Sequence, residues 1–467
     1  MFEQRRKDRI QGELAMSGST TNTGAAAKSR RHFLKSSGHF VAASALTGLI
    51  GRRSYAAGNS TIKLALVGCG GRGTGAVVDA LSAKGGPVKL CAMADLFEKR
   101  LQSSLDNLTK GFKDKIDVPP ERRFIGFDAY KKAMACLSPG DVVLLTTHAA
   151  FRPMHFEHAV KKGLNVFAEK SFATDGPAVR RWLKTAEESQ RKGLKVGVGF
   201  MWRHSDARKQ VIRRIHDGQI GDVHTMRIYR VHGPVVCPPL PAGANELKFQ
   251  LQHPNSFTWV SSGFFIDWHC HNIDVACWAK DAWPVSAQGF GGRCFEKAGS
   301  QFDHYTVEYT FADGTKLFAF SRHMTGCWET YSDYAHGSKG SAVIMASLRA
   351  PMCKIYKSHN MVPGELVWQY PDRDPSPYRA EWQLLLDAIR QDKPHNEATR
   401  AGQAEVAALM GRAATHTGQL VTWDQTLNSK FQFIEDIDGM TFDTPAPIHA
   451  GPDGIYPPPQ PGITKEV

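Results

Sequence analysis

The sequence predicts an α/β protein with two domains: a doubly wound parallel sheet, followed by an α+β domain with a large, mostly antiparallel open sheet. Two observations support this fold class. Short apolar strands alternate with helical stretches over residues 62–199, and a run of alternating strands begins near residue 223. A chain of 467 residues has room for both domains and their cores.

The first strand leads directly into a glycine-rich turn. Residues 62–67 are apolar and are followed by Gly-Cys-Gly-Gly-Arg-Gly and by a helical stretch over 74–81. Gly68 permits a tight turn, Gly70 lets the backbone approach a pyrophosphate, and Gly73 lets helix and strand pack closely. Because the helix N-terminus presents its positive dipole end to the phosphates, this turn predicts a Rossmann dinucleotide site.

A carboxylate follows the second strand. Residues 88–94 end at Asp95, 22 residues after Gly73. Such a carboxylate binds the adenosine ribose hydroxyls and repels a 2′-phosphate, which favours NAD over NADP. Asp95 is also suited to cap the next helix, and Arg100 nearby leaves room for NADP.

The alternation continues to residue 199. Helices are expected at 128–136, 153–162 and 175–191, and strands at 142–146, 164–168 and 195–199. We therefore assign residues 57–203 to the dinucleotide-binding Rossmann domain.

A twin-arginine export signal is predicted at residues 1–56. The pair Arg30-Arg31, within Ser-Arg-Arg-His-Phe-Leu-Lys, precedes an apolar stretch at 40–50 and a small-residue cleavage site ending at Ala56. This implies passage through the twin-arginine machinery to a periplasmic or otherwise exported location. Because no free nicotinamide pool exists there, a dinucleotide would have to stay bound through turnover.

Composition excludes several partners. The formal net charge of +13 falls to +6 without residues 1–56, since 48 basic and 42 acidic residues then remain. No basic stripe interleaved with aromatic residues occurs, so nucleic acid is not expected as a partner. The sequence contains no apolar stretch of about 20 residues, so no membrane span is expected. The nine cysteines have no CxxC spacing, which favours small buried side chains over a metal site.

Further motifs occur in a fixed order along the chain. They are Phe151-Arg152-Pro153-Met154-His155-Phe156, Gly163 to Lys170 with the strand end Glu169-Lys170, Gly199 to His204, Gly218 to Val223, Gly326-Cys327-Trp328 and His336 to Gly340. With the glycine turn, they resemble the Gfo/Idh/MocA oxidoreductases, which include glucose–fructose oxidoreductase and inositol dehydrogenase, and in particular the exported members. The resemblance extends from Ile62 to about Asn428, and it implies this same two-domain fold.

The resemblance implies catalytic roles for three residues. The family has a strand ending in Glu-Lys-Pro whose lysine lies beside the nicotinamide and the reacting hydroxyl; Lys170 matches this lysine, whereas Ser171 replaces the proline of an often cis turn. Asp267 and His271 share one helix face and match an aspartate and a histidine that reach the substrate. Asp267 would orient or polarise the substrate, and His271 would take the hydroxyl proton. The like charge of a nicotinamide cation predicts a lowered pKa for Lys170.

Plainer interpretations of these residues stay open. A lysine at a strand end is commonly solvated, and an Asp–His pair on a helix is commonly a surface pair. The spacing of His269 and His271 suggests a metal, but residues i and i+2 point apart on a helix and no third ligand is evident nearby, so no metal is expected. His269 also stands where relatives usually have a small residue.

Two sets of binding residues follow. The predicted cofactor set is Gly68, Gly70, Gly71, Arg72, Gly73, Asp95, Thr146, Thr147, Glu169 and Lys170. The predicted substrate set consists of polar side chains suited to a polyol, namely Arg152, Arg203, His204 and Asn272.

Residues 204–375 are expected to form a substrate and oligomerisation domain. It has a helix at 205–217 and strands at 223–231, 284–289, 305–311, 316–322, 328–335 and 341–345, with a hairpin turn at Asp313-Gly314. Residues 376–428 carry helices at 381–390 and 399–415 that are expected to pack back onto the first domain. The tail, 429–467, is rich in proline and is expected to extend over the surface or over a neighbouring subunit of a homo-oligomer.

Three functions follow from these patterns. The first is an NAD(P)-dependent oxidoreductase with a tightly bound cofactor that acts on a secondary alcohol of a sugar, cyclitol or glycoside. The second is a redox-neutral enzyme that cleaves a glycoside through a transient keto-sugar, which export favours because a trapped cofactor must be regenerated within one cycle. The third is a non-catalytic polyol- or dinucleotide-binding protein, which stays open because Ser171 replaces the proline of the family's Glu-Lys-Pro.

Overall fold

The computed structural model describes residues 60–295, 297, 299–346 and 353–467. The predicted export signal, 1–56, lies outside these residues. Within the described part, no helix has the length and apolar character needed to cross a membrane.

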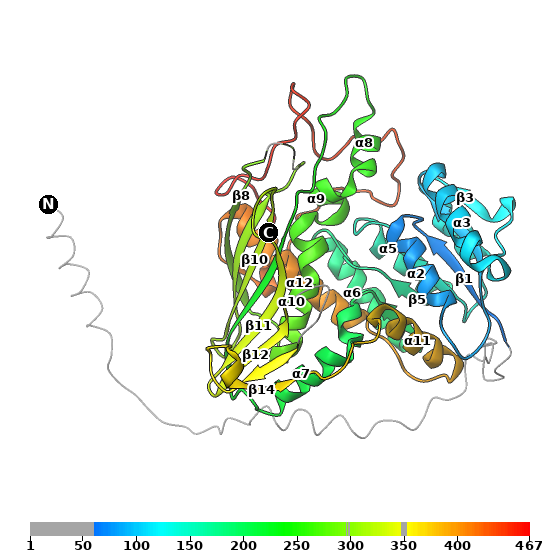
Figure 1. The fold of residues 1–467 in the computed structure, drawn as a ribbon. Coiled ribbons are helices and arrows are strands. Elements are labelled where there is room, and N and C mark those ends of the chain that lie inside the picture. Colours follow the sequence, from blue (N-terminus) through cyan, green and yellow to red (C-terminus); the bar gives the residue numbers. More distant parts are fainter. Residues whose placement is uncertain (1–59, 296, 298, 347–352) are drawn as a thin grey trace, which may run out of the picture. The chain divides into compact units, whose positions relative to one another are not determined.

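Six parallel strands form the first sheet (Figure 1). They are β1 (Ile62–Val67), β2 (Val88–Asp95), β3 (Arg123–Ile125), β4 (Val142–Leu145), β5 (Asn165–Ala168) and β6 (Val196–Val198). Their order is β3-β2-β1-β4-β5-β6. The direction of strand addition reverses between β1 and β4, which is where doubly wound sheets bind ligands.

Side chains of these strands alternate between two cores, because successive residues point to opposite faces. Leu64 and Leu66 belong to one core, which also contains Trp382, whereas Ala65 and Val67 belong to the other. The helices on the first face are α2 (Gly71–Leu81), α3 (Glu98–Phe112) and α11 (Pro377–Arg390), and those on the second are α4 (Ala129–Ala135), α5 (Arg152–Lys161) and α6 (Gly176–Arg191).

Nine strands form the second sheet. They are β7 (Val223–His232), β8 (Ser286–Gly292), β9 (His304–Thr310), β10 (Lys316–His323), β11 (Thr330–Gly337), β12 (Gly340–Met345), β13 (Lys354–Tyr356), β14 (Leu366–Gln369) and β15 (Val421–Thr422). Their order is β14-β13-β12-β11-β7-β10-β9-β8-β15, and every neighbouring pair is antiparallel except β7 and β10.

Two long helices cover one face of this sheet. α10 (Gly263–Lys280) packs on β7 and β11, and α12 (Ala398–Thr417) lies beside it against β8 and β9 (Figure 1). Residues of β10 alternate strictly between buried and half-buried, as expected when only one face is covered. The remaining helices are α7 (Asp206–His216), α8 (Glu246–Gln252), α9 (Thr258–Ser261) and α13 (Trp423–Asn428).

The predicted fold class is confirmed, with local differences. Helix α2 begins at Gly71 rather than at residue 74, because the glycine turn itself forms its first turn. Strands β3, β13, β14 and β15 were not predicted, since they are short and lie toward the edges of their sheets. β15 pairs with β8, so residues 421–422 extend the second sheet instead of covering the first.

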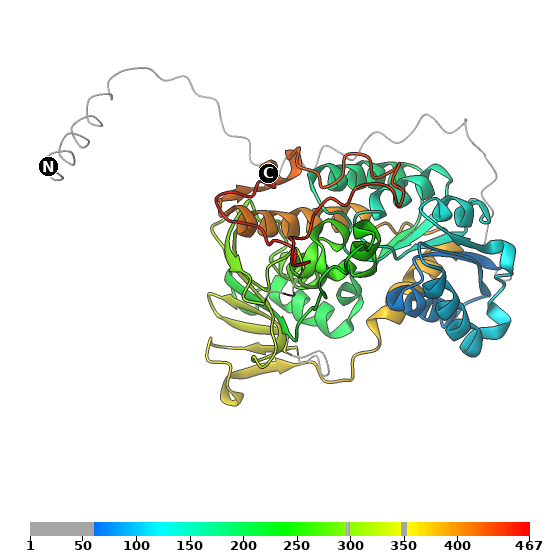
Figure 2. The ribbon, with the colours of Figure 1, turned by 90° about the horizontal axis from the view of Figure 1, so that it is seen from above.

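The proline-rich tail crosses the protein's own surface, as Figure 2 shows in red. Asp438 pairs with Arg181 of α6, the Ile448 carbonyl accepts from the Gln250 side chain of α8, and Glu466 reaches Arg412 of α12. The tail therefore connects elements of both domains.

Candidate active site

The glycine turn is shaped by close backbone contacts. Gly68 has a φ of +100°, and a Cβ added at Gly73 would lie 2.1 Å from the Gly68 carbonyl oxygen. Thr146 Oγ1 donates a hydrogen bond of 2.5 Å to that same oxygen. At Gly70, by contrast, a Cβ would meet nothing within 4 Å, and the start of α2 has no side-chain cap. The first N–H groups of α2 are therefore available to an anion.

A cavity of about 430 Å³ opens beside this turn, at the carboxyl ends of β1, β2 and β4. Its lining residues are Gly68, Gly70, Gly71, Arg72, Gly73, Asp95, Leu96, Phe97, Arg100, Thr146, Thr147, His148, Phe151, Leu251, Pro254 and Asn255. Eight of the ten predicted cofactor residues line it, and the other two, Glu169 and Lys170, follow β5 at the same edge of the sheet.

Asp95 has a structural task in addition to its place in the cavity wall. Its carboxylate accepts the backbone N–H of Cys69 at 2.6 Å and of Phe97 at 2.8 Å. Burial raises the pKa of Asp95, and these N–H groups oppose that rise. The carboxylate thus holds the glycine turn against β2 and also orders the chain before α3.

Arg72 and Glu169 form an ion pair below the turn, with 2.7 Å between Nε and Oε1. Burial disfavours the guanidinium charge, but Glu169 and the other acidic groups nearby together outweigh burial, and the pKa of Arg72 is raised. The Arg72 guanidinium also lies over the ring of Tyr378 on α11, at 4.7 Å. This pair links the glycine turn to the strand end that carries Lys170.

Lys170 meets Asp267 of α10. Its Nζ donates to Asp267 Oδ1 at 2.8 Å and also to the Asp267 carbonyl oxygen. The peptide bond between Lys170 and Ser171 is cis. Burial alone would lower the pKa of Lys170, but Asp267, Cys270 and Glu169 together outweigh burial and raise it. Lys170 is therefore an ammonium ion beside Asp267, and the lowering of its pKa expected beside a nicotinamide cation stays a prediction for the loaded site.

His271 lies one helical turn beyond Asp267 on α10. Its Nδ1 is buried without a hydrogen-bond partner, and its ring meets that of Phe200 edge to face at 5.7 Å. Burial, together with the cations Lys170 and Arg230, holds the pKa of His271 well below its ordinary value. The imidazole is therefore neutral at pH 7 and has a lone pair available.

His269 takes a different direction. It is fully buried, and its Nδ1 shares a hydrogen bond with Ser321 Oγ of β10. Its ring therefore packs against the second sheet, whereas His271 lies near Lys170. The two histidines do not converge on a shared ligand.

Two of the predicted substrate residues, Arg152 and Asn272, are buried and bind other protein groups. Arg152 donates to the carbonyl oxygens of Thr147 and Ser171, so it clamps the turn after Lys170. Asn272 is fully buried and donates to Asp333 Oδ1 of β11 at 2.6 Å. The protein's own groups therefore hold both side chains, and a role for either in substrate binding stays a prediction.

Arg203 and His204 also have charged protein partners. Arg203 binds both carboxylate oxygens of Asp274 on α10, at 2.8 and 2.9 Å. His204 Nε2 lies 3.4 Å from Glu397 Oε1, and Arg400 bridges Glu397 and Asp274. These side chains form a charged cluster that ties α10 and α12 to the end of the first domain.

Sequence reasoning missed two residues of the site. His148 lines the cavity and lies close enough to Asp267 and Lys170 to feel their charges, while burial lowers its pKa to about 3. Arg230 stacks on the rings of Trp268 and Tyr331, and its charge helps to lower the pKa of His271. A signal existed for each: His148 directly follows the predicted pair Thr146-Thr147 after β4, and Arg230 shares the inward-facing register of Met226 and Ile228.

No protein-family model matches the sequence. Among curated proteins, the chain is similar to dTDP-3,4-didehydro-2,6-dideoxy-alpha-D-glucose 3-reductase of Actinomadura kijaniata, with 25% identity over 186 residues, or 40% of this chain and 47% of that protein. The chain thus spans about half the length of the curated relative it matches.

Solved structures match over more of the chain. Scyllo-inositol dehydrogenase of Lactobacillus casei, with bound NAD(H) and scyllo-inositol, has a TM-score of 0.56 and 21% identity, over 78% of this chain and 100% of that one. Aldose-aldose oxidoreductase of Caulobacter crescentus, complexed with glycerol, has a TM-score of 0.59 and 14% identity, over 78% of this chain and 100% of that one. These likenesses show that the chain has the two-domain fold of these sugar and cyclitol oxidoreductases.

Proposed function

We propose that the protein is a nicotinamide-dinucleotide-dependent oxidoreductase of the Gfo/Idh/MocA type that acts on a secondary alcohol of a sugar, cyclitol or glycoside. One observation carries this proposal. A glycine-lined cavity at the strand-order reversal adjoins a Lys–Asp pair and a neutral histidine contributed by the second domain.

The residues of the cavity fit a dinucleotide. The turn at 68–73 leaves the N–H groups of α2 uncapped for a pyrophosphate, and the space above Gly70 is open. At the β2 end, the Asp95 carboxylate suits ribose hydroxyls and disfavours a 2′-phosphate, so we propose NAD, although Arg100 nearby is the group that NADP would need. The bound nicotinamide would accept the hydride from the substrate carbon.

The protein's own groups divide the remaining work. The Lys170 ammonium, oriented by Asp267, donates a hydrogen bond to the reacting oxygen and stabilises negative charge that develops there. His271 is neutral, and its unpartnered Nδ1 accepts the hydroxyl proton. Arg152 holds the turn that carries Lys170 through two backbone carbonyls. The charge states of Lys170 and His271 are therefore the ones that alcohol oxidation needs.

The similar proteins support the substrate class at a coarse level. Their names describe a sugar 3-reductase, a cyclitol dehydrogenase and an aldose oxidoreductase. We also propose that the predicted signal at 1–56 directs export by the twin-arginine route, with the dinucleotide bound before transport. Mass spectrometry of the exported protein and of small molecules released on denaturation tests both points: a chain beginning after Ala56 and a released dinucleotide are expected.

The variant Lys170→Met tests the chemistry. We expect turnover to fall about 10²- to 10³-fold, because a positioned donor that stabilises the developing negative charge is lost, while the dinucleotide stays bound. Lys99→Met, a change at an exposed lysine of α3, serves as the matched control and should keep full activity. Turnover is followed by absorbance in the reduced-nicotinamide band with candidate polyols and glycosides.

The outcomes separate the candidate functions. A lasting rise in absorbance supports net oxidation, and glycoside cleavage without a lasting rise supports the redox-neutral route. Undiminished turnover by Lys170→Met would remove Lys170 from the mechanism. Bound dinucleotide with no change for any polyol would favour a binding protein.

A further inference from the structure

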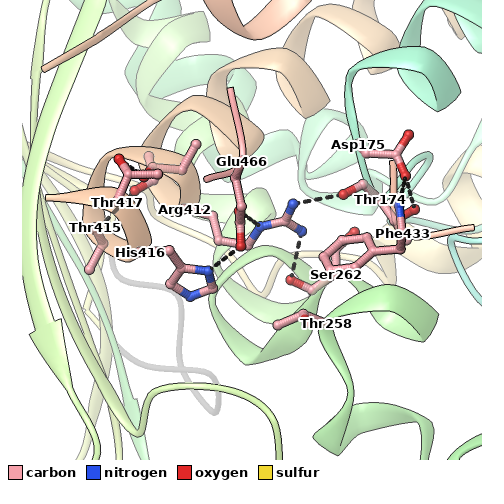
Figure 3. A network of polar contacts seen from close by, with 12 residues as sticks. Thr174, Asp175, Thr258, Ser262, Arg412, Thr415, His416, Thr417, Phe433 and Glu466 are labelled. Carbon is pink, nitrogen blue, oxygen red and sulfur yellow. Dashed lines mark hydrogen bonds and ion pairs between the residues drawn. The ribbon is translucent and has the colours of Figure 1, made fainter. Parts of the chain in front are cut away.

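Residue Glu466 of the tail is buried inside the protein. Its side-chain oxygens accept from Arg412 Nε at 3.0 Å and from His416 Nδ1 at 2.7 Å, both on α12 (Figure 3). Its backbone carbonyl accepts from Ser429 Oγ at 3.3 Å. A carboxylate from a tail without helices or strands therefore occupies a prepared cationic site.

The guanidinium of Arg412 is shared between the tail and the two segments that carry the proposed catalytic residues. Its Nη2 donates to the Thr174 carbonyl at 2.7 Å, and its Nη1 donates to the Ser262 carbonyl at 3.4 Å (Figure 3). Thr174 lies four residues after Lys170, and Ser262 lies five residues before Asp267. One side chain thus holds the Lys170 turn and the start of α10 together.

Neighbouring contacts act on the same junction. Ser262 Oγ donates to the Ala173 carbonyl at 2.6 Å, and Glu405 of α12 accepts the Phe172 N–H at 3.0 Å. Ser262 has a φ of +71°, a left-handed conformation that a residue other than glycine keeps only when its surroundings hold it. The two catalytic segments are therefore held together both by a direct hydrogen bond and by contacts with α12.

Electrostatics make the tail carboxylate necessary for this arrangement. Burial would raise the pKa of Glu466, but Arg412 and His416 outweigh burial and lower it to about 2. Glu466 is thus ionised and balances the buried guanidinium. The other acidic groups near Arg412 are engaged elsewhere, since Asp175 caps α6 and Glu405 binds the Phe172 backbone. Without Glu466, Arg412 would lose its direct carboxylate partner.

We propose that Glu466 is a positioning residue: by seating Arg412, the tail fixes the distance between the Lys170 turn and α10, so that Lys170, Asp267 and His271 face the substrate together. The inference rests on the proposed function, because it assumes that these three residues do the chemistry. Glu466 itself touches neither the cavity beside the glycine turn nor Lys170. Its loss should therefore impair turnover and leave dinucleotide binding intact.

The test compares Glu466→Gln with Lys465→Gln, a change at the exposed residue before it. We expect kcat of Glu466→Gln to fall about 100-fold, since small displacements of catalytic groups cost rates of that order. Dinucleotide affinity should stay within about 2-fold, because the cradle is unchanged. Lys465→Gln should match the wild type in both. Unchanged kcat for Glu466→Gln, or an equal fall for Lys465→Gln, would overturn the proposal.

A second variant separates positioning from stability. Arg412→Met combined with Glu466→Gln removes the buried charge together with its partner, so folding should recover relative to Glu466→Gln alone while kcat remains low. Recovery of kcat along with stability would mean that Glu466 acts only by stabilising the fold, and would overturn its positioning role.

Hydrogen exchange supplies a measurement that does not depend on activity. In Glu466→Gln, amides of residues 170–175 and 262–267 should exchange faster than in Lys465→Gln, whereas those of residues 68–81 should not change. If the wild type shows no turnover, the proposed function fails, but the exchange pattern still decides whether Glu466 holds the two segments. Equal exchange in both variants would show that it does not.

Discussion

The two sides of the candidate site are built from different kinds of material. The cofactor side is a contiguous turn in which the backbone supplies the shape and the donors, and its glycines are required by contacts such as that between Gly73 and the Gly68 carbonyl. The catalytic side is assembled from side chains, with Lys170 after β5 and Asp267 and His271 on α10. A site made of backbone depends on local spacing, whereas a site made of side chains depends on tertiary contacts.

The charges on the two sides differ as well. On the cofactor side, the Asp95 carboxylate is held mainly by backbone N–H groups. On the catalytic side, buried charges meet one another: Lys170 with Asp267, Arg203 with Asp274, and Arg412 with Glu466. Removal of one partner from a buried pair is costly, so the catalytic side should be sensitive to single substitutions far from the substrate.

The largest expected effect tests the backbone side. In Gly73→Ala, the new methyl group would lie 2.1 Å from the Gly68 carbonyl oxygen, so the turn and α2 must move apart. We expect dinucleotide affinity to fall about 100-fold, equivalent to about 2.7 kcal/mol of binding free energy. Isothermal titration of the cofactor-free protein measures this loss.

Gly111→Ala is the control for that experiment. Gly111 lies in the last turn of α3, and a Cβ there meets nothing within 4 Å. Its affinity for the dinucleotide should equal that of the wild type. Normal affinity in Gly73→Ala would mean that the turn accommodates a side chain and that the cradle is not built on close backbone contact.

This contrast explains which parts of the molecule could be predicted. The glycine turn and five of the six strands of the first sheet follow from runs of neighbouring residues, and β1 has the predicted bounds, Ile62–Val67. Lys170, Asp267 and His271 were found because a family resemblance supplied long-range information that spacing alone does not contain. The structure brings Lys170 and Asp267 together over 97 residues of sequence.

The predicted substrate residues show where such reasoning ends. A polar side chain near a site looks the same in sequence whether it binds a sugar or another buried group. Arg152, Arg203, His204 and Asn272 all have protein partners, and those partners lie on distant elements. The contact between Glu466 and Arg412, which are far apart in the sequence, could not be predicted for the same reason.

The second prediction tests whether Arg203 acts on the protein's own structure or on the substrate. In Arg203→Gln, Asp274 keeps Arg400 as a partner, and we expect the free energy of unfolding to fall by about 2 kcal/mol, less than for a fully orphaned buried charge. The KM for the polyol should not change. Denaturant unfolding and steady-state kinetics measure the two quantities.

Arg213→Gln provides the comparison, because Arg213 is mostly exposed and its contact with Asp217 is 3.9 Å. It should behave like the wild type in both measurements. A large rise in KM for Arg203→Gln without a loss of stability would return Arg203 to the substrate site.

The smallest expected effect concerns Asp333, the partner of Asn272 behind α10. Burial raises the pKa of Asp333 to about 7, against hydrogen bonding by Asn272 and the charges of Arg208 and Arg230. Because the folded state holds this proton more tightly than the unfolded state, its contribution to stability is complete below the ordinary aspartate pKa and is lost as the pH rises through 7. Between pH 6 and pH 8.5 the wild type should lose about 1 kcal/mol of unfolding free energy on this account.

Asp333→Asn keeps an oxygen acceptor but does not titrate, so its stability should fall less over the same interval, which urea unfolding at both pH values will show. Parallel losses in the two proteins would mean that Asp333 is ionised throughout, and that the contacts of α10 with the second sheet include a buried carboxylate rather than a neutral acid.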